Sequence, residues 1–240
     1  NTCFENRKMS YYEHCRYRNF EGVVIVCANF DDPDVIELMN SEIPVVTIDY
    51  VHHNCTAVTS NNIQGMEDLV KYIYSQGHRK IAYIHGQEGS SVTRDRLASF
   101  YRTIDELGLE IPDTYVRSAD YLETKGSAKQ TKELLNLEDP PTCIIYPDDT
   151  SLIGGRNVII EMGLRIPRDI SVAGYDGTMI SQLLYPKLTT IRQNTEMIGS
   201  EAATRLIGTI EKPRTTLVER VVIEGSLVPG QSVGAIQPKG

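Results

Sequence analysis

The sequence has 240 residues, of which 40% are hydrophobic and 23% are charged, so it can bury a globular core and is neither disordered nor fibrous. Its formal net charge of −8 opposes non-specific attraction to nucleic acid, which requires a surplus of lysine and arginine. No apolar run approaches the roughly 20 residues that span a bilayer, so no membrane partner is expected. The five cysteines have no CxxC spacing and are odd in number, which favours neither a disulfide framework nor a zinc site and fits a reducing cytoplasm.

Short apolar, β-branched runs alternate along the chain with amphipathic stretches of helical length. This alternation is typical of βαβ units built around a mainly parallel sheet. Most of the runs are apolar throughout, as expected for strands that are covered on both faces. In chain order, the predicted strands are 22–28, 44–49, 80–84, 142–146, 170–174, 188–191 and 216–224. The sequence therefore predicts an α/β fold.

Several of the helices predicted between these strands have recognisable ends. Asp32 is placed to cap a helix that has Pro33 at its first position, where the missing N–H costs nothing. The predicted helices 62–76, 93–107 and 150–162 are each followed by a glycine that can adopt the left-handed conformation of a C-terminal cap. The tail from residue 229 contains glycine, proline and glutamine and is expected to be frayed.

Three segments together resemble the LacI/GalR family of bacterial transcription regulators. They are Gly-His-Arg-Lys-Ile-Ala-Tyr-Ile at 77–84, the turn and strand at 163–176, and Leu-Thr-Thr-Ile-Arg-Gln at 188–193. Their order and spacing are similar to those of the family's core, and the resemblance extends from about residue 22 to residue 228. It is more specific than any single glycine motif in the chain.

The resemblance implies the type I periplasmic-binding-protein fold, with two doubly wound parallel-sheet lobes joined by three crossovers. The crossovers are expected near 57–59, 185–187 and 211–213. The predicted N-terminal lobe is 1–58 plus 187–212, the C-terminal lobe is 59–186 plus 213–228, and the tail is 229–240. Residues 1–10 resemble the exit from the family's second strand, so its first strand and helix are expected to be missing from this sequence, as is its helix-turn-helix head.

Ligands of open α/β sheets bind beyond the carboxyl ends of the strands, so polar residues at those positions are candidates. Arg96 matches the position of the family's ligand arginine, and its planar fork can chelate hydroxyl groups or a carboxylate. The alternative is a surface ion pair with Asp95 or Glu88. Asp176 follows the strand 170–174 and can accept hydrogen bonds from paired sugar hydroxyls, or it can form an Asx-turn with the next glycine.

Other candidates come from both lobes. One of Asp148 and Asp149 is predicted to cap the following helix, with Asp149 favoured, and Asp148, where the family usually has asparagine, is predicted to contact ligand. Tyr121 matches a position where the family often has an aromatic residue, which can pack on the apolar face of a sugar or simply in the core. Asp49 and Tyr50 end the strand 44–49 and are the candidates from the N-terminal lobe.

Motifs of other functional classes are weak. The glycine-containing segment 86–91 lacks the lysine of a P-loop and is predicted to be a turn before a helix. His52, His53 and His85 have no partners at metal-ligand spacing, so no metal is expected. There is no nucleophile elbow or convincing triad, so no catalytic residue and no cofactor are predicted, and an α/β enzyme is the least favoured class.

The resemblance implies a non-enzymatic, cytoplasmic sensor that binds a small polar effector, a sugar, in the cleft between its lobes. It would act as a homodimer on operator DNA, and only through a head domain that this sequence does not contain. The helix residues 151–162, with Gly154 and Gly155, are the predicted dimer seam, and the alternative for some of them is burial of the helix on its own sheet. The alternative is an extracytoplasmic sugar-binding protein that serves a transporter or receptor, against which the free cysteines argue.

Overall fold

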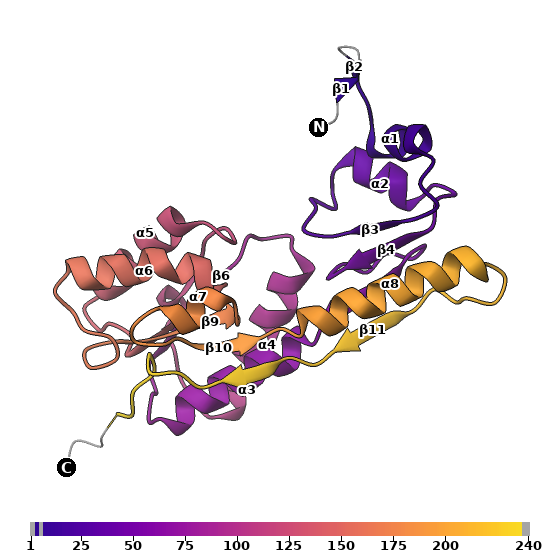
Figure 1. Cartoon of the computed structure of the whole chain (residues 1–240). Helices are drawn as coiled ribbons and strands as arrows, with labels where there is room; N and C mark the ends of the chain where they lie inside the picture. The colour runs from indigo at the N-terminus through magenta and orange to yellow at the C-terminus, as the bar shows by residue number, and fades with distance from the viewer. Residues whose placement is uncertain (1–2, 5–6, 237–240) are drawn as a thin grey trace. The chain divides into compact units, whose positions relative to one another are not determined.

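The computed structural model describes residues 3–4 and 7–236, which form two compact units (Figure 1). Unit 1 comprises the chain up to Ser60 together with Asn194–Ile223, and unit 2 comprises Asn61–Gln193 together with the chain from Glu224. The chain therefore passes between the units three times, at residues 60–61, 193–194 and 223–224. The predicted α/β class with largely parallel sheets is confirmed.

Unit 1 is built on a four-stranded parallel sheet with the order β11-β5-β4-β3. Helices α1 and α2 bury Cys15, Val35 and Leu38 against one face, and α8 buries Ile198 and Ala202 against the other (Figure 1). A short antiparallel hairpin, β1 with β2, precedes these elements. The bounds are β1 Cys3–Phe4, β2 Arg7–Lys8, α1 Tyr11–Arg18, β3 Val23–Ile25, α2 Pro33–Met39, β4 Val45–Ile48, β5 Thr56–Ser60, α8 Thr195–Glu211 and β11 Arg220–Ile223.

Unit 2 is built on a six-stranded sheet with the order β12-β10-β9-β8-β6-β7, in which only the edge strand β12 is antiparallel to its neighbour. Its two cores lie on opposite faces, one under α3 and α4 and the other under α5 and α6. The bounds are α3 Asn62–Ser75, β6 Ile81–His85, α4 Ser91–Glu106, η1 Asp113–Tyr115, β7 Val116–Ser118, α5 Thr124–Leu135, β8 Cys143–Ile145, α6 Asp149–Glu161, β9 Ser171–Asp176, α7 Met179–Leu183, β10 Thr189–Arg192 and β12 Ser226–Val228.

The predicted helix ends are confirmed. The Asp32 side chain accepts a hydrogen bond from the Asp34 N–H and Pro33 opens α2. Gly77, Gly108 and Gly163 follow α3, α4 and α6 and have φ values of +93°, +64° and +76°, in the left-handed region that glycine enters without steric cost.

Two predicted lobe boundaries are wrong. Strand β10 pairs with β9, so residues 187–193 belong to unit 2 and not to the N-terminal lobe. Strand β11 pairs with β5, so residues 213–223 belong to unit 1 and not to the C-terminal lobe. The segment 57–59, predicted as a crossover, lies inside β5, a buried strand of unit 1. Strand β5 was not predicted because the hydroxyl groups of Thr56, Thr59 and Ser60 are typical of loops.

The predicted frayed tail is also wrong for residues 229–236. Ser232 is buried, its carbonyl accepts from the Val172 N–H at 2.9 Å, and its hydroxyl donates to the Val172 carbonyl at 2.6 Å. The Ile236 N–H donates to the Gln76 carbonyl at 2.8 Å. These bonds attach the segment to unit 2, while residues 237–240 lie outside the described residues, as do residues 1–2 and 5–6 of the segment that resembled a strand exit.

The glycines of the predicted dimer seam are used inside unit 2. A Cβ atom at Gly154 would lie 1.9 Å from the Thr124 carbonyl oxygen, and one at Gly155 would lie 2.1 Å from the Tyr146 hydroxyl. Leu152 is fully buried in the same core. The glycines therefore allow α6 to pack closely on α5 and β8, so their part in a dimer seam was wrong, and dimerisation itself stays a prediction.

In the portion of the chain that the structure covers, no helix combines the length and hydropathy needed to cross a membrane.

Candidate functional site

The guanidinium of Arg96 is buried at the carboxyl ends of the strands of unit 2. It lies in the second turn of α4, and only 3% of its surface is exposed. Its Nε donates to Asn62 Oδ1 at 2.8 Å and its Nη1 to the Pro147 carbonyl at 3.0 Å. Its Cζ lies 3.5 Å from the centroid of the Tyr175 ring, a cation–π contact. Residues from α3, β9 and the end of β8 thus fix the orientation of this side chain.

The third nitrogen of Arg96 faces Asp176. Arg96 Nη2 lies 3.7 Å from Asp176 Oδ1, and Gln193 Nε2 donates to the same oxygen. Asp176 has a φ of +91°, which is rare for a residue with a side chain and is kept only where its surroundings enforce it. Burial by itself would lower the pKa of Arg96, but Tyr175, Tyr121 and the Asp176 carboxylate raise it overall, so the guanidinium stays charged.

Tyr121 lies beside this pair. Its ring centroid is 5.9 Å from Arg96 Cζ, and its hydroxyl lies 2.9 Å from Thr93 Oγ1. Burial raises the pKa of Tyr121, so the phenol is neutral. A Cβ atom at Gly86 would lie 2.1 Å from the Tyr121 ring, so the glycine leaves room for it. The segment 86–91 is the predicted turn, with Ser90 capping α4.

The helix-capping role predicted for Asp149 is wrong, whereas the ligand contact predicted for Asp148 stays a prediction. Asp148 is the residue that caps α6: its Oδ1 accepts from the Ser151 N–H at 2.7 Å. Its Oδ2 accepts from Ser151 Oγ at 2.7 Å and from the Leu122 N–H at 2.9 Å, and only 1% of its surface is exposed. Asp148 therefore ties the loop that carries Tyr121 to the start of α6.

Asp149 instead holds the turn that follows Asp176. Its Oδ2 accepts from the Thr178 N–H at 2.7 Å and from Thr178 Oγ1 at 3.0 Å, and its Oδ1 accepts from Thr190 Oγ1 at 2.8 Å. Burial, with a contribution from the Asp176 charge, raises the pKa of Asp149 to about 6. A Cβ atom at Gly174 would lie 2.3 Å from Asp149 Oδ1, so glycine is needed there.

Sequence reasoning missed the supporting residues Asn62, Tyr175 and Gly174, and it gave Asp149 a different role. Asn62 opens α3, two positions after β5 ends at Ser60, and that strand was not predicted, so the rule that sites lie at the carboxyl ends of strands did not point to it. Tyr175 directly precedes the candidate Asp176 and falls under that rule. Their contacts to Arg96 come from elements that are far apart in the sequence. Neither residue type signals that partnership.

Asp49 and Tyr50 lie at the carboxyl end of β4 in unit 1. Asp49 has a φ of +58°, and its Oδ1 accepts from the Ser60 N–H at 2.8 Å. The Tyr50 ring stacks on Phe30, with centroids 4.0 Å apart and an angle of 1° between the rings. Phe30 follows β3, so two neighbouring strands end in a partly buried aromatic pair. Sequence reasoning missed Phe30.

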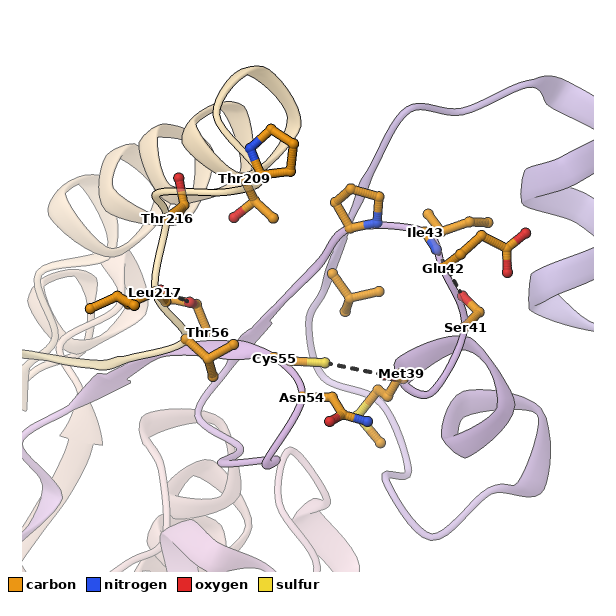
Figure 2. Close-up of a pocket in the computed structure, with 14 residues that line it drawn as sticks. Met39, Ser41, Glu42, Ile43, Asn54, Cys55, Thr56, Thr209, Thr216 and Leu217 are labelled. Carbon is orange, nitrogen blue, oxygen red and sulfur yellow. Dashed lines mark hydrogen bonds between the residues drawn. The ribbon is translucent and has the colours of Figure 1, made fainter.

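A cavity of about 360 Å³ lies elsewhere in unit 1 (Figure 2). Its walls come from the segments just before β4, β5 and β11 and from the end of α8. The buried Cys55 lines it, with Sγ donating to the Met39 carbonyl at 3.6 Å, and burial raises the pKa of this thiol to about 11. The cavity lies at the amino ends of strands, opposite Asp49 and Tyr50, so it is not the predicted ligand site.

No group of three or more histidine, cysteine, aspartate or glutamate side chains within residues 3–4 and 7–236 is arranged to hold a metal ion.

Comparison with known proteins gives the family. The periplasmic binding protein-like domain matches residues 70–233, which is more than half of the chain. The HTH-type transcriptional repressor ExuR of Bacillus subtilis (strain 168) is 28% identical over 207 residues, which are 85% of this chain and 62% of ExuR. This chain thus spans less than two thirds of the length of that relative.

Solved structures agree in fold. A transcriptional regulator LacI from Bacillus cereus subsp. cytotoxis NVH 391-98 is 25% identical with a TM-score of 0.86, covering 94% of this chain and 80% of the other. A complex of the transcriptional regulator CelR with cellobiose is 25% identical with a TM-score of 0.82, covering 93% of this chain and 71% of the other. The chain therefore belongs to the periplasmic binding protein-like domain family, and it is similar to LacI-type transcription regulators.

Proposed function

We propose that this chain is the effector-sensing core of a LacI-type repressor and that its effector is a sugar. The observation that carries this function is the buried, charged Arg96, whose Nη2 faces Asp176 across 3.7 Å at the carboxyl end of β9. The chain would be non-enzymatic and cytoplasmic, and it would act as a homodimer. Operator DNA would be bound through a helix-turn-helix head and not by the residues described above.

The chemistry of the pair suits a diol. Two nitrogens of Arg96 already donate to Asn62 and Pro147, which leaves Nη2 as the nitrogen directed at Asp176. The separation of 3.7 Å is longer than a hydrogen bond. One sugar hydroxyl can accept from Nη2 while its neighbour donates to the carboxylate, so adjacent hydroxyls would satisfy both charged groups at once.

Aromatic side chains provide the complementary apolar contact. Tyr121 lies beside Arg96 in unit 2, and Tyr50 stacks on Phe30 in unit 1. The C–H faces of a sugar pack favourably on such rings. The similarity to CelR, whose structure contains cellobiose, supports a sugar over other polar effectors. We include Asp49 as a polar contact from unit 1, and assign Asp148 to positioning Tyr121.

The effector would act by preferring one conformation of the regulator over another. A differential affinity of a few kcal/mol is enough to shift such an equilibrium. No bond of the sugar needs to break, so the site requires positioned donors and acceptors and no nucleophile.

The test is calorimetric titration of the chain with neutral and acidic sugars, cellobiose among them. Arg96→Lys keeps the charge but loses the planar fork, so it should weaken the best ligand by about 2 kcal/mol or more. Arg94→Lys is the matched control, because the Arg94 side chain lies on the same helix and is 77% exposed. Circular dichroism establishes that both variants are folded. Unchanged affinity in folded Arg96→Lys would refute the assignment.

A further inference from the structure

A second depression, of about 490 Å³, lies on unit 2 between the edge strand β7 and the C-terminal half of α5. It is lined by Arg117, Lys129, Lys132, Glu133, Asn136 and Leu137. This half of α5 leads towards the amino end of β8, whereas Arg96 lies at the carboxyl ends of the strands. The depression is therefore separate from the proposed sugar site.

The lining of the depression is positively charged. Three cations and one carboxylate surround it, in a chain whose net charge is −8. Over the described ranges, 3–4 and 7–236, none of these three cations forms an ion pair with a carboxylate. Three cations gathered around one hollow, with a single carboxylate among the lining residues, indicate an anion site.

Arg117 is the lining residue that comes from the sheet, in strand β7. It pairs in register with Ile84, whose side chain belongs to the core under α5 and α6, so the Arg117 side chain lies on the α5 face of the sheet. Its Nε is buried and has no hydrogen-bond partner among the described residues. A buried donor without an acceptor is unfavourable, so an anion that drew the guanidinium into the hollow would supply the missing acceptor.

We propose that this hollow binds the phosphate group of a small phosphorylated metabolite. The guanidinium fork of Arg117 can bind two phosphate oxygens, while Lys129 and Lys132 add point charges. Glu133 and Asn136 offer acceptors for hydroxyl groups on the remainder of the ligand. The volume is within the range of small-molecule sites.

A nucleic acid backbone would need a longer track of charge than this hollow provides. The three cations converge on one depression, and the rest of the chain is strongly acidic. A single phosphate group matches this arrangement better than a polymer does.

The experiment is amide chemical-shift mapping of the full chain with glycerol 3-phosphate, with glycerol and potassium chloride at equal ionic strength as controls. We expect saturable shifts at residue 117 and at residues 129–137, and none with glycerol. Arg117→Gln should weaken the binding at least tenfold. Lys129→Gln/Lys132→Gln, altered only at exposed positions, should weaken it similarly if Arg117→Gln does not fold.

Lys125→Gln is the matched control, since it removes one exposed charge from the same helix outside the hollow and should leave the affinity within twofold. The inference is overturned if no shifts appear, if they are unchanged in the hollow variants, or if they centre on Arg96. It is also overturned if a DNA oligonucleotide shifts the same residues at lower concentration than glycerol 3-phosphate does.

Discussion

The carboxyl ends of the two sheets are built from different chemistry. In unit 2, Arg96, Asp148 and Asp149 are charged residues that are each at most 3% exposed, and each is held by at least two hydrogen bonds. In unit 1, the corresponding end carries the stacked pair Phe30 and Tyr50. Buried charged groups held in fixed positions select ligands by where their hydroxyl groups lie. Aromatic rings contribute apolar contact area and tolerate variation in the sugar. Specificity should therefore reside in unit 2, and unit 1 should add affinity without much selection.

The largest expected effect is on sugar binding when Asp176 is changed. Asp176→Ala leaves Arg96 Nη2 without its facing carboxylate and should cost on the order of 2 to 4 kcal/mol of binding. If the two residues act as one unit on adjacent hydroxyls, Asp176→Ala and Arg96→Lys will be non-additive in a double-mutant cycle measured by calorimetry. Strictly additive losses would mean that the residues act separately.

The second largest effect is expected in the pH dependence of folding stability, through Asp149 of unit 2. The pKa of Asp149 is about 6 in the folded chain, against 3.8 ordinarily, so the folded state holds this proton more tightly than the unfolded state. Its contribution to stability is therefore complete below about pH 4 and is lost as pH rises through about 6, a change on the order of 2 to 3 kcal/mol.

Asp149→Asn should remove that part of the slope in urea unfolding measured from pH 4 to 7. Asp105→Asn, at an exposed position of α4, is the control and should keep the slope of the parent chain. Parallel curves for Asp149→Asn and the parent would show that Asp149 does not titrate in this window.

The smallest effect is expected in unit 1. Tyr50→Leu removes the stacking partner of Phe30 and should cost about 0.5 to 1.5 kcal/mol of sugar binding, with the ranking of sugars unchanged. Tyr17→Leu is the control because Tyr17 is an exposed tyrosine of the same unit, outside the pair. Should Tyr50→Leu reorder the sugars, unit 1 would carry specificity and the contrast between the units would fail.

The parts of the fold that could be predicted are those whose signals are local. Apolar runs and glycine caps such as Gly77 and Gly163 mark strands and helix ends from a few neighbouring residues. Strand β5 was missed because its polar residues become strand-like only between β4 and β11. The ordered segment at Ser232 was missed for the same reason, since its partners lie at Val172 and Thr189.

The candidate site likewise contains residues that the sequence could predict and residues that it could not. Resemblance together with the strand-end rule selected Arg96, Tyr121 and Asp176, which the fold brings together in unit 2. Which of the two adjacent aspartates caps α6 could not be decided from the sequence, because the choice depends on backbone direction and on donors such as Leu122 and Thr178. Sequence thus finds candidate ligand-binding residues more readily than the residues that hold them in place.

The most direct test of a sugar site at Arg96 and Asp176 is a crystal structure of the chain with the sugar that binds best in titration. Adjacent hydroxyl groups of the sugar should lie about 3 Å from Arg96 Nη2 and from an oxygen of Asp176. A sugar bound with neither residue in contact, for example in the cavity beside Cys55, would contradict the central claim.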